Sequence, residues 1–415
     1  MYQARFADKL LAERLRSAGA VLIEGTRGSG KTETSLQQSA SVVRFDADEE
    51  VRLKMEVDPK LLLVGAAPRL LDEWQEFPAI WNYVRRAVDE RGQKGQFILT
   101  GSASPDEQTK RHSGVGRFSV MKMRTMSFCE KKWSTGEVSL LALMKNEEPS
   151  SDSVSMALED YADKITLGGW PGTLYATAAE GMRFASDYAN LIADADLSKV
   201  SRKRRDPIKI KRLLQSLARN ISTEANLTAL ARDTKGSDGL LDDETVAEYL
   251  DCLERLMVID NLPAWNTHIR SSYKLRKAPK RHFADPSIAV GILEMSNDKM
   301  LANLNYFGLL FESLVIHNLR IYAGIHGGKI FHYRDSGGYE IDAIIEYPDG
   351  EWGAFEIKLG LGAADEAASN LLKFASKIDT GKTKAPAALT VITSNGFAHR
   401  RADGVNVVPL CVLTV

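Results

Sequence analysis

The chain has 415 residues, enough for two or three domains that each bury their own apolar core. Its 54 lysine and arginine residues balance 55 aspartate and glutamate residues, so no overall basic field marks it as a nucleic-acid-binding protein, and only local patches could contact DNA. A zinc site and a disulfide framework are both disfavoured, and a reducing cytoplasm is favoured, because no C-x-x-C pair occurs among Cys129, Cys252 and Cys411.

The hydrophobic pattern also bears on location and fold class. The first residues lack an apolar signal core, and no stretch approaches the roughly 18 apolar residues needed to span a bilayer. We therefore expect a cytoplasmic protein without a membrane partner. Strands alternating with helices over residues 1–140 predict an α/β fold.

A phosphate-binding loop follows the first apolar run of the chain, residues 20–23. The complete motif G-x-x-x-x-G-K-[ST] is formed by Gly25, Thr26, Arg27, Gly28, Ser29, Gly30, Lys31 and Thr32. In such a loop the glycines let backbone N–H groups approach phosphates, Lys31 reaches the β- and γ-phosphates, and the Thr32 hydroxyl ligates Mg²⁺. The sequence therefore predicts binding of ATP together with Mg²⁺.

Two further predicted strands end in polar residues. The first ends in Asp72 and Glu73 and resembles a Walker B motif, in which Asp72 would hold Mg²⁺ through water and Glu73 would orient the attacking water. The second, residues 95–103, carries Thr100 and Ser102, which could sense the γ-phosphate. Because ligands bind at the carboxyl ends of the strands in an open α/β sheet, we expect one cleft to receive all these groups.

Arg117 lies in a glycine-flanked turn, residues 113–118. An arginine at this place can act as an arginine finger across a subunit boundary of a homo-oligomer, or it can cap a strand. Its position in the sequence leaves both roles open.

The middle of the chain is predicted to be helical. Residues 150–200 are expected to form a helical lid on the nucleotide domain, around a break at residues 168–172. Residues 205–285 contain three predicted helices, at residues 208–219, 227–233 and 243–256, followed by residues 258–262 and a strand-like segment at residues 273–275. Together they resemble a winged helix. The third of these helices, residues 243–256, is acidic and would repel phosphates, so a protein-facing role is the better interpretation.

Two basic segments flank these helices. The run of residues 201–205 is more consistent with a solvated linker than with a nucleic-acid clamp. The second segment either binds phosphate or forms an ordinary exposed hairpin. It contains Arg270, Lys274, Arg276, Lys277, Lys280 and Arg281.

A second group of candidate site residues lies in the last part of the chain, residues 286–415. Asp342 and Glu356 fall on two neighbouring predicted strands, and Lys358 follows on the same face as Glu356. Glu312, in a predicted helix, supplies another acid. Two or three carboxylates that converge can hold Mg²⁺ and orient a water against a phosphodiester.

This set resembles the PD-(D/E)xK nuclease fold, with Glu312 on the helix, Asp342 at the bend, and Glu356 and Lys358 on the next strand. Ile341 stands where the family's name-giving proline would be. The resemblance implies that Glu312, Asp342 and Glu356 bind metal and that Asp342, Glu356 and Lys358 serve catalysis on DNA. Retained cleavage does not follow from the fold, because such folds tolerate loss of their chemistry.

The whole chain resembles bacterial and archaeal AAA+ ATPases whose C-terminal domain of unknown function has a restriction-endonuclease-like core. The resemblance implies an ATPase core, a winged-helix middle and a nuclease-like end. It depends on the order of Gly25–Thr32, Asp72 and Glu73, Gly101 and Ser102, Gly116 and Arg117, Gly168–Pro171, Phe283–Pro286, Phe311 and Glu312, and Glu356–Lys358.

Three functions remain open at this point. The leading interpretation is an ATP-driven machine that acts on nucleic acid. The alternative is a nucleotide-dependent switch whose C-terminal domain is an inactive scaffold for a protein partner. A signal-transducing NTPase would differ from the first only in its trigger, which the sequence does not reveal.

Overall fold

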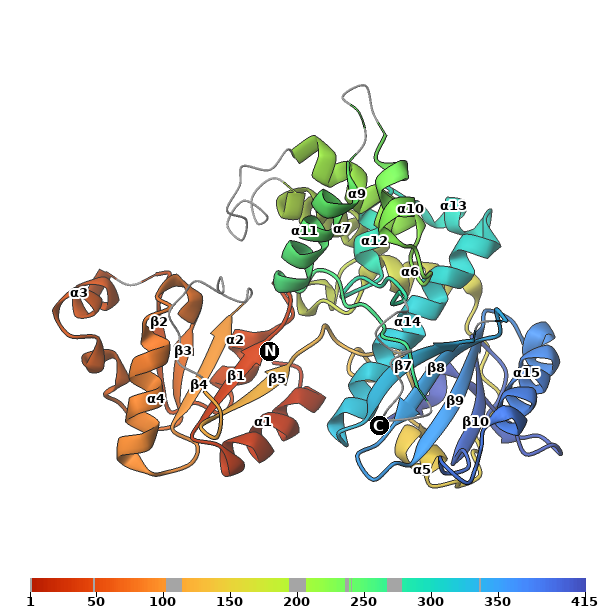
Figure 1. The fold of residues 1–415 in the computed structure, drawn as a ribbon, viewed down its shortest axis with the longest axis horizontal. Coiled ribbons are helices and arrows are strands. Elements are labelled where there is room, and N and C mark those ends of the chain that lie inside the picture. The colour runs from red at the N-terminus through yellow and green to blue at the C-terminus, as the bar shows by residue number, and fades with distance from the viewer. Residues whose placement is uncertain are drawn as a thin grey trace. The chain divides into compact units, whose positions relative to one another are not determined.

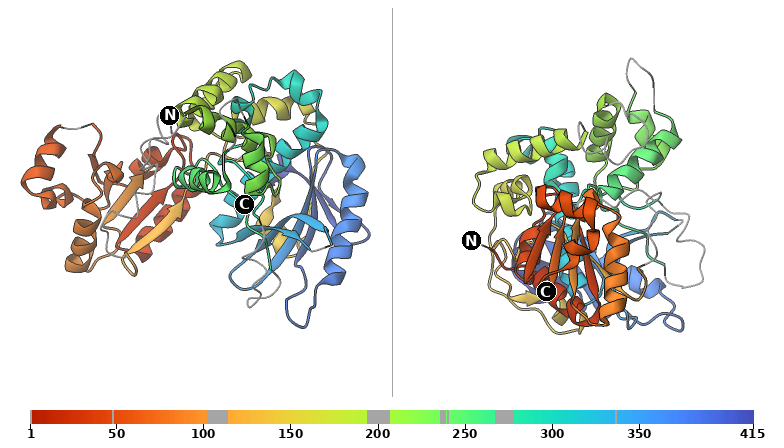
Figure 2. Two further views of the ribbon diagram at one scale, coloured as in Figure 1. Left: turned by 45° about the horizontal axis from the view of Figure 1, so that its top comes forward. Right: turned by 90° about the vertical axis from the view of Figure 1, so that its left-hand side faces the viewer.

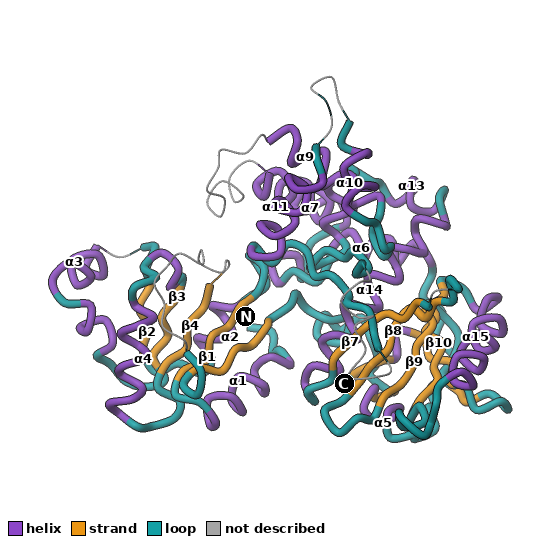
Figure 3. Tube along the Cα trace, viewed as in Figure 1, coloured by secondary structure: helices purple, strands orange, loops and turns teal. Residues whose placement is uncertain are grey.

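A computed structural model describes residues 2–47, 49–101, 114–193, 207–235, 239, 241–266, 278–335 and 337–415 (Figures 1 and 3). The chain divides into two compact α/β units, the first formed mainly by residues 1–125 and the second mainly by residues 126–415. The segment Cys252–Val258 groups with the first unit. Ser102, the basic run 201–205, and Arg270, Lys274, Arg276 and Lys277 lie outside the described residues.

The first unit is built on a parallel five-stranded sheet with the order β2-β3-β4-β1-β5. The strands are β1 Ala20–Glu24, β2 Ser41–Arg44, β3 Arg69–Asp72, β4 Phe97–Gly101 and β5 Phe118–Lys122. The helices are α1 Phe6–Ser17, α2 Lys31–Leu36, α3 Glu49–Val57 and α4 Ile80–Arg91, with short 3-10 turns at Pro59–Leu63 and Trp74–Glu76. This order places β4 between the strand before the phosphate loop and the strand that ends in Asp72.

Alternate side chains of these strands enter two separate apolar cores. Ala20 and Leu22 of β1 pack in the core that contains α4, whereas Val21 and Ile23 pack in the core that contains α1. A strand buried on both faces reads as a continuous apolar run, which explains the sequence of residues 20–23. Helices therefore cover both faces of the sheet, and the polar residues lie at its carboxyl edge.

The second unit contains a mixed six-stranded sheet with the order β11-β12-β10-β9-β8-β7. The strands β7, β8 and β9 are antiparallel, β9, β10 and β12 are parallel, and β11 is an antiparallel edge. The strands are β7 Lys329–Arg334, β8 Glu340–Glu346, β9 Trp352–Lys358, β10 Ala388–Thr393, β11 His399–Arg400 and β12 Asn406–Pro409. Helix α14, Leu304–Ile325, packs along β7 to β9, and α15, Ala364–Lys377, covers one face of the sheet (Figure 2).

The boundary between the units lies near residue 125 rather than at the predicted residue 140. Strand β6, Val138–Ser139, pairs with the C-terminal strand β13, Leu413–Thr414, and helix α5, Leu140–Met144, follows it. Residues 126–140 thus belong to the second unit and not to the predicted ATPase core.

The helices expected to form a lid of the nucleotide domain pack within the second unit instead. Helix α7, Ala178–Leu191, contacts α12, Ser287–Ile292, and α6, Leu158–Leu167, contacts α13, Asn297–Leu301. They are joined by a turn at Gly168 and Gly169, whose N–H donates to the buried carboxylate of Asp285 at 2.8 Å. Gly168 has a φ of 61°, and a Cβ there would lie 2.5 Å from the same carboxylate, so the turn requires glycine.

The three helices predicted in the middle of the chain are confirmed almost to the residue, as α9 Pro207–Arg219, α10 Leu227–Asp233 and α11 Asp243–Arg255. The predicted strand 273–275 lies outside the described residues, so the winged-helix arrangement stays a prediction. None of the described helices combines the length and the apolar character that a membrane crossing requires.

Candidate functional site

The phosphate loop connects β1 to α2. Gly28 and Gly30 have positive φ angles of 73° and 96°, which residues with a Cβ rarely adopt. A Cβ on Gly25 would lie 2.2 Å from the carbonyl oxygen of Met123, the residue that follows β5. The glycines of the motif are therefore required by the shape of the loop.

Lys31 turns its ammonium back into this loop. Nζ donates to the carbonyl oxygens of Gly25 at 2.8 Å and Thr26 at 2.9 Å, and the residue is only 6% exposed. Burial lowers the pKa of Lys31 to about 8, although Glu73 and Asp72 act in the opposite direction. The loop thus surrounds a buried ammonium with backbone dipoles.

Three predicted site residues from separate elements meet beside this loop. The hydroxyl of Thr32 on α2 donates to Oδ1 of Asp72 at 2.9 Å, and the hydroxyl of Thr100 on β4 donates to the same oxygen. The carboxylate of Asp72 is buried at the end of β3. A hydroxyl and a carboxylate are oxygen donors of the kind that Mg²⁺ prefers, so this part of the site fits the predicted ion.

Glu73 directly follows Asp72 and has a strained backbone. Its φ and ψ are 54° and 43°, in the left-handed region that non-glycine residues seldom occupy and that is enriched at functional sites. The side-chain amide of Gln75 donates to its carboxylate. Gly101 leaves the room for Gln75, because a Cβ there would lie 2.5 Å from the Gln75 amide oxygen. The sequence did not single out Gln75 as a partner of Glu73.

Arg117 lies at the amino ends of the strands, on the side of the sheet opposite to the phosphate loop. It immediately precedes β5, and its carbonyl oxygen accepts the N–H of Ala20 at the start of β1. The phosphate loop follows the end of β1, so within the first unit Arg117 is at the edge opposite to the loop. Its guanidinium pairs with Asp89 at 2.6 Å. These contacts favour the role of a strand cap, and a finger role would require a second copy of the chain.

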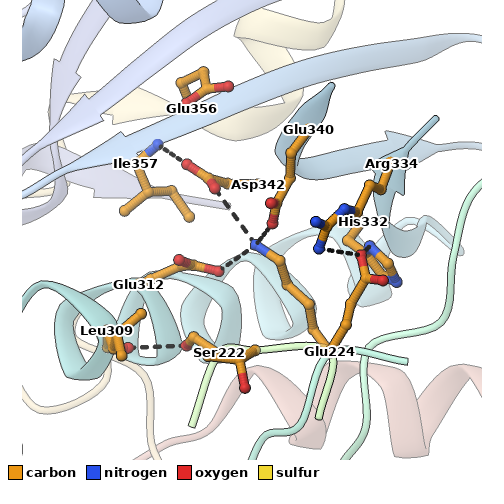
Figure 4. Close-up of polar contacts among 12 residues, drawn as sticks. Ser222, Glu224, Leu309, Glu312, His332, Arg334, Glu340, Asp342, Glu356 and Ile357 are labelled. Carbon is orange, nitrogen blue, oxygen red and sulfur yellow. Dashed lines mark hydrogen bonds and ion pairs between the residues drawn. The ribbon is translucent and has the colours of Figure 1, made fainter. Parts of the chain in front are cut away.

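In the second unit, a cavity of about 610 Å³ is lined by all four predicted residues, Glu312, Asp342, Glu356 and Lys358. We call it the carboxylate pocket. Figure 4 shows the three acidic residues. Helix α14 supplies Glu312, β8 supplies Asp342, and β9 supplies the other two.

Asp342 lies on strand β8 and not at the predicted bend. There its side chain accepts a backbone hydrogen bond from the neighbouring strand β9. The ladder between β8 and β9 ends at the pair Ala343 and Phe355. Just beyond it, the N–H of Ile357 donates to Oδ2 of Asp342 at 2.9 Å. Burial by itself would raise the pKa of Asp342, but Lys280, Lys358 and this N–H together lower it.

Glu356 is held by two donors. Lys358 Nζ lies 2.7 Å from Oε2, and the side-chain amide of Asn370 on α15 donates to Oε1 at 2.7 Å. Burial, together with the charge of Asp342, raises the pKa of Glu356 to about 8. The sequence did not single out Asn370, because a lone asparagine on a helix carries no motif.

Lys280 occupies the space between the carboxylates. Its Nζ lies 2.8 Å from Glu312, 2.7 Å from Glu340 and 3.5 Å from Asp342, and the residue is 2% exposed. The three acidic residues are labelled in Figure 4. Burial would lower the pKa of Lys280, but the three carboxylates raise it well above its ordinary value. The prediction that Lys280 and Arg281 belong to an exposed or phosphate-binding hairpin is therefore wrong, because both are buried.

Lys280 also changes the expected metal site. Within the described ranges, no group of three or more His, Cys, Asp or Glu side chains is arranged to hold a metal ion. Glu312 faces the ammonium of Lys280, and burial raises the pKa of Glu312 to about 7 despite this contact. Glu312, Asp342 and Glu356 therefore share one pocket without forming a three-carboxylate metal site.

Comparison with protein-family models divides the chain into three parts. Residues 17–131 match the model of an AAA domain. Residues 158–299 and 307–413 match two models of domains of unknown function, DUF8612 and DUF4143. The first of these two models spans most of the predicted lid and the whole of the predicted winged helix.

Two similar proteins, both uncharacterized, come from Mycobacterium bovis and Mycobacterium tuberculosis. Each is 26% identical over 363 residues, which cover 86% of this chain and 74% of the relative. Among solved structures, the Walker-type ATPase of Pyrococcus abyssi is 12% identical with a TM-score of 0.43, covering 69% of this chain and 94% of its own. That TM-score is too low to establish a shared fold. By its family match and its phosphate loop, the N-terminal part of this chain is an AAA-type, P-loop NTPase-like domain.

Proposed function

We propose that the chain binds ATP with Mg²⁺ and hydrolyses it at the phosphate loop. The observation that carries this proposal is the meeting of Thr32, Asp72 and Thr100 at the carboxyl edge of the parallel sheet, next to the loop that holds Lys31. The match of residues 17–131 to the AAA domain model supports it.

Each residue has a role in this proposal. The ammonium of Lys31 neutralises the β- and γ-phosphates, with backbone N–H groups from residues 25–32 around them. Thr32 and Asp72 would hold Mg²⁺, which supplies further neutralisation of the phosphate charge when it is bound. Thr100, whose hydroxyl donates to Asp72, would sense the γ-phosphate, and Ser102 would share this role. Glu73 orients the attacking water and accepts its proton.

Release of phosphate from ATP by the full chain tests this proposal, with nucleotide binding measured in parallel. Lys31→Ala should abolish binding or turnover, because it removes the cation at the β- and γ-phosphates. Lys94→Ala is a matched control, since Lys94 is an exposed lysine of the same unit. Undiminished hydrolysis by Lys31→Ala would place the ATPase site elsewhere.

A second proposal concerns the carboxylate pocket, where ATP turnover would control engagement of nucleic acid. The observation that supports it is the gathering of Glu312, Asp342, Glu356 and Lys358 around one cavity. The acidic groups are, however, already paired with lysines of the same chain. This pairing favours the alternative, a nucleotide-dependent switch whose C-terminal domain is a scaffold for a protein partner.

ATPase turnover with and without DNA separates these alternatives. Stimulation by DNA that falls steeply with salt would support action on nucleic acid, because phosphate contacts release counterions. Cleavage that is lost in Asp342→Ala and Glu356→Ala would place the chemistry in the pocket. Turnover that DNA leaves unchanged at low salt would support the scaffold.

A further inference from the structure

The carboxylate pocket contains a cation that belongs to the chain itself. We propose that Lys280 takes the place of the divalent metal ion that a PD-(D/E)xK-like site would need, so that the pocket of the wild-type protein does not bind Mg²⁺ or Mn²⁺. This inference is independent of the proposed ATPase activity, which lies in the other unit.

The spacing of the acidic oxygens suits an ammonium. A lysine ammonium has three N–H donors, and three carboxylates lie around Nζ of Lys280 at 2.8, 2.7 and 3.5 Å. Mg²⁺ requires oxygens at about 2.0–2.1 Å in a near-octahedral arrangement. To bind the ion at this place, Glu312, Glu340 and Asp342 would have to move inward after the ammonium had left.

Hydrogen bonds hold the backbone of Lys280 in place, so its side chain is a fixed part of the pocket. Lys280 and Leu262 exchange two backbone hydrogen bonds, of 3.0 and 2.9 Å. The next residue, Arg281, donates its N–H to the carbonyl of Thr223 at 2.8 Å. The stem of Lys280 is buried together with its ammonium. Expelling the ammonium would leave the carboxylates of the pocket without their counter-charge, which is strongly unfavourable.

The remaining acids of the pocket are engaged in the same way. Asp342 also accepts the N–H of Ile357 and lies 3.5 Å from Lys358 Nζ. Glu356 accepts from Lys358 and from Asn370. Each carboxylate that the metal site would use is thus already bound by a donor of this chain.

Binding of Mn²⁺ to the full chain without nucleotide tests this inference, with free Mn²⁺ measured by electron paramagnetic resonance. Wild type and Asp342→Asn should give the same titration curve, because neither has a metal site in the pocket. Lys280→Met keeps most of the stem and removes the charge, and it should bind Mn²⁺ at least about tenfold more tightly than wild type. The added Asp342→Asn change should abolish this gain.

Lys358→Met is the matched control, because it removes the other lysine of the pocket and leaves Lys280 in place. It should not gain a Mn²⁺ site. A site present in wild type and lost in Asp342→Asn would overturn the inference, as would a folded Lys280→Met protein without the gain. If circular dichroism shows that Lys280→Met is unfolded, the comparison of wild type with Asp342→Asn still decides the matter.

Discussion

The two units each bury a lysine at the centre of their candidate site, and the two lysines are held in opposite ways. Lys31 donates to two backbone carbonyls, and burial lowers its pKa to about 8. Lys280 is surrounded by three carboxylates, which raise its pKa above the ordinary value. Backbone dipoles compensate a buried charge only in part, whereas three carboxylates more than balance it.

This difference bears on what each site can bind. An ammonium that is held only by carbonyl dipoles gains from the approach of an anion such as a triphosphate. An ammonium that is already neutralised by carboxylates gains nothing from an anion and also keeps a metal cation away from them. The first site is therefore suited to nucleotide binding, and the second is suited to holding the second unit together.

The largest expected effect concerns Glu73, the acid next to the site of Lys31. Glu73→Gln should lower ATP turnover by about 10²–10⁴-fold, because an amide cannot accept the proton of the attacking water. Nucleotide affinity should stay close to wild type, since Lys31, Thr32 and Asp72 are unchanged. Single-turnover kinetics with labelled ATP measures both quantities, and unchanged turnover would assign the role of base to another residue.

Removing the charge of Lys280 should mainly affect stability. Lys280→Met leaves Glu312, Glu340 and Asp342 facing one another, which should cost the second unit about 3–5 kcal/mol. Hydrogen–deuterium exchange should then be faster in β8 and β9 and unchanged in β1 and β4. Adding Glu312→Gln should restore part of the protection, because it removes one of the unpaired charges. Equal protection in wild type and Lys280→Met would show that the three carboxylates need no counter-charge.

Lys31→Met should affect stability in the opposite direction from Lys280→Met. Exchange in β1 and β4 should be unchanged or slower, with a gain in local stability of at most about 2 kcal/mol, because a costly buried charge is removed together with two hydrogen bonds. The pKa of Lys31 is lowered from 10.5 in the unfolded chain to about 8, so the unfolded state binds more protons between these values. Wild-type stability should thus rise relative to Lys31→Met between about pH 8 and about pH 10. A gap that stays constant over this range would contradict the lowered pKa.

The sequence predicted the two sites to different extents. The phosphate loop, Asp72 and Thr100 were found because each belongs to a short local motif, and parallel strands necessarily bring their carboxyl ends to one edge. Lys280 was misread because it follows a run of basic residues that resembles a solvated segment. Its partners Glu312 and Asp342 are 32 and 62 residues away, and no local pattern connects them. The same holds for Asp285 and the turn at Gly169, which are 116 residues apart.

The smallest expected effect is that of Arg117→Ala. This change distinguishes a nucleotide site that is complete within one chain from a site that is shared between two copies. As a strand cap, Arg117 forms a solvent-exposed ion pair with Asp89, and such pairs contribute little to stability. Arg117→Ala should then change both turnover and exchange in β5 only slightly, as Asp89→Ala should.

An arginine finger supplied by a second copy would instead lower turnover by about 10³-fold or more in Arg117→Ala alone. Mixing this variant with Lys31→Ala would then restore activity, since each protein supplies the group that the other lacks. Rescue of this kind would show that the nucleotide site is completed by a partner chain, in contrast to the carboxylate pocket, whose described groups all come from one chain.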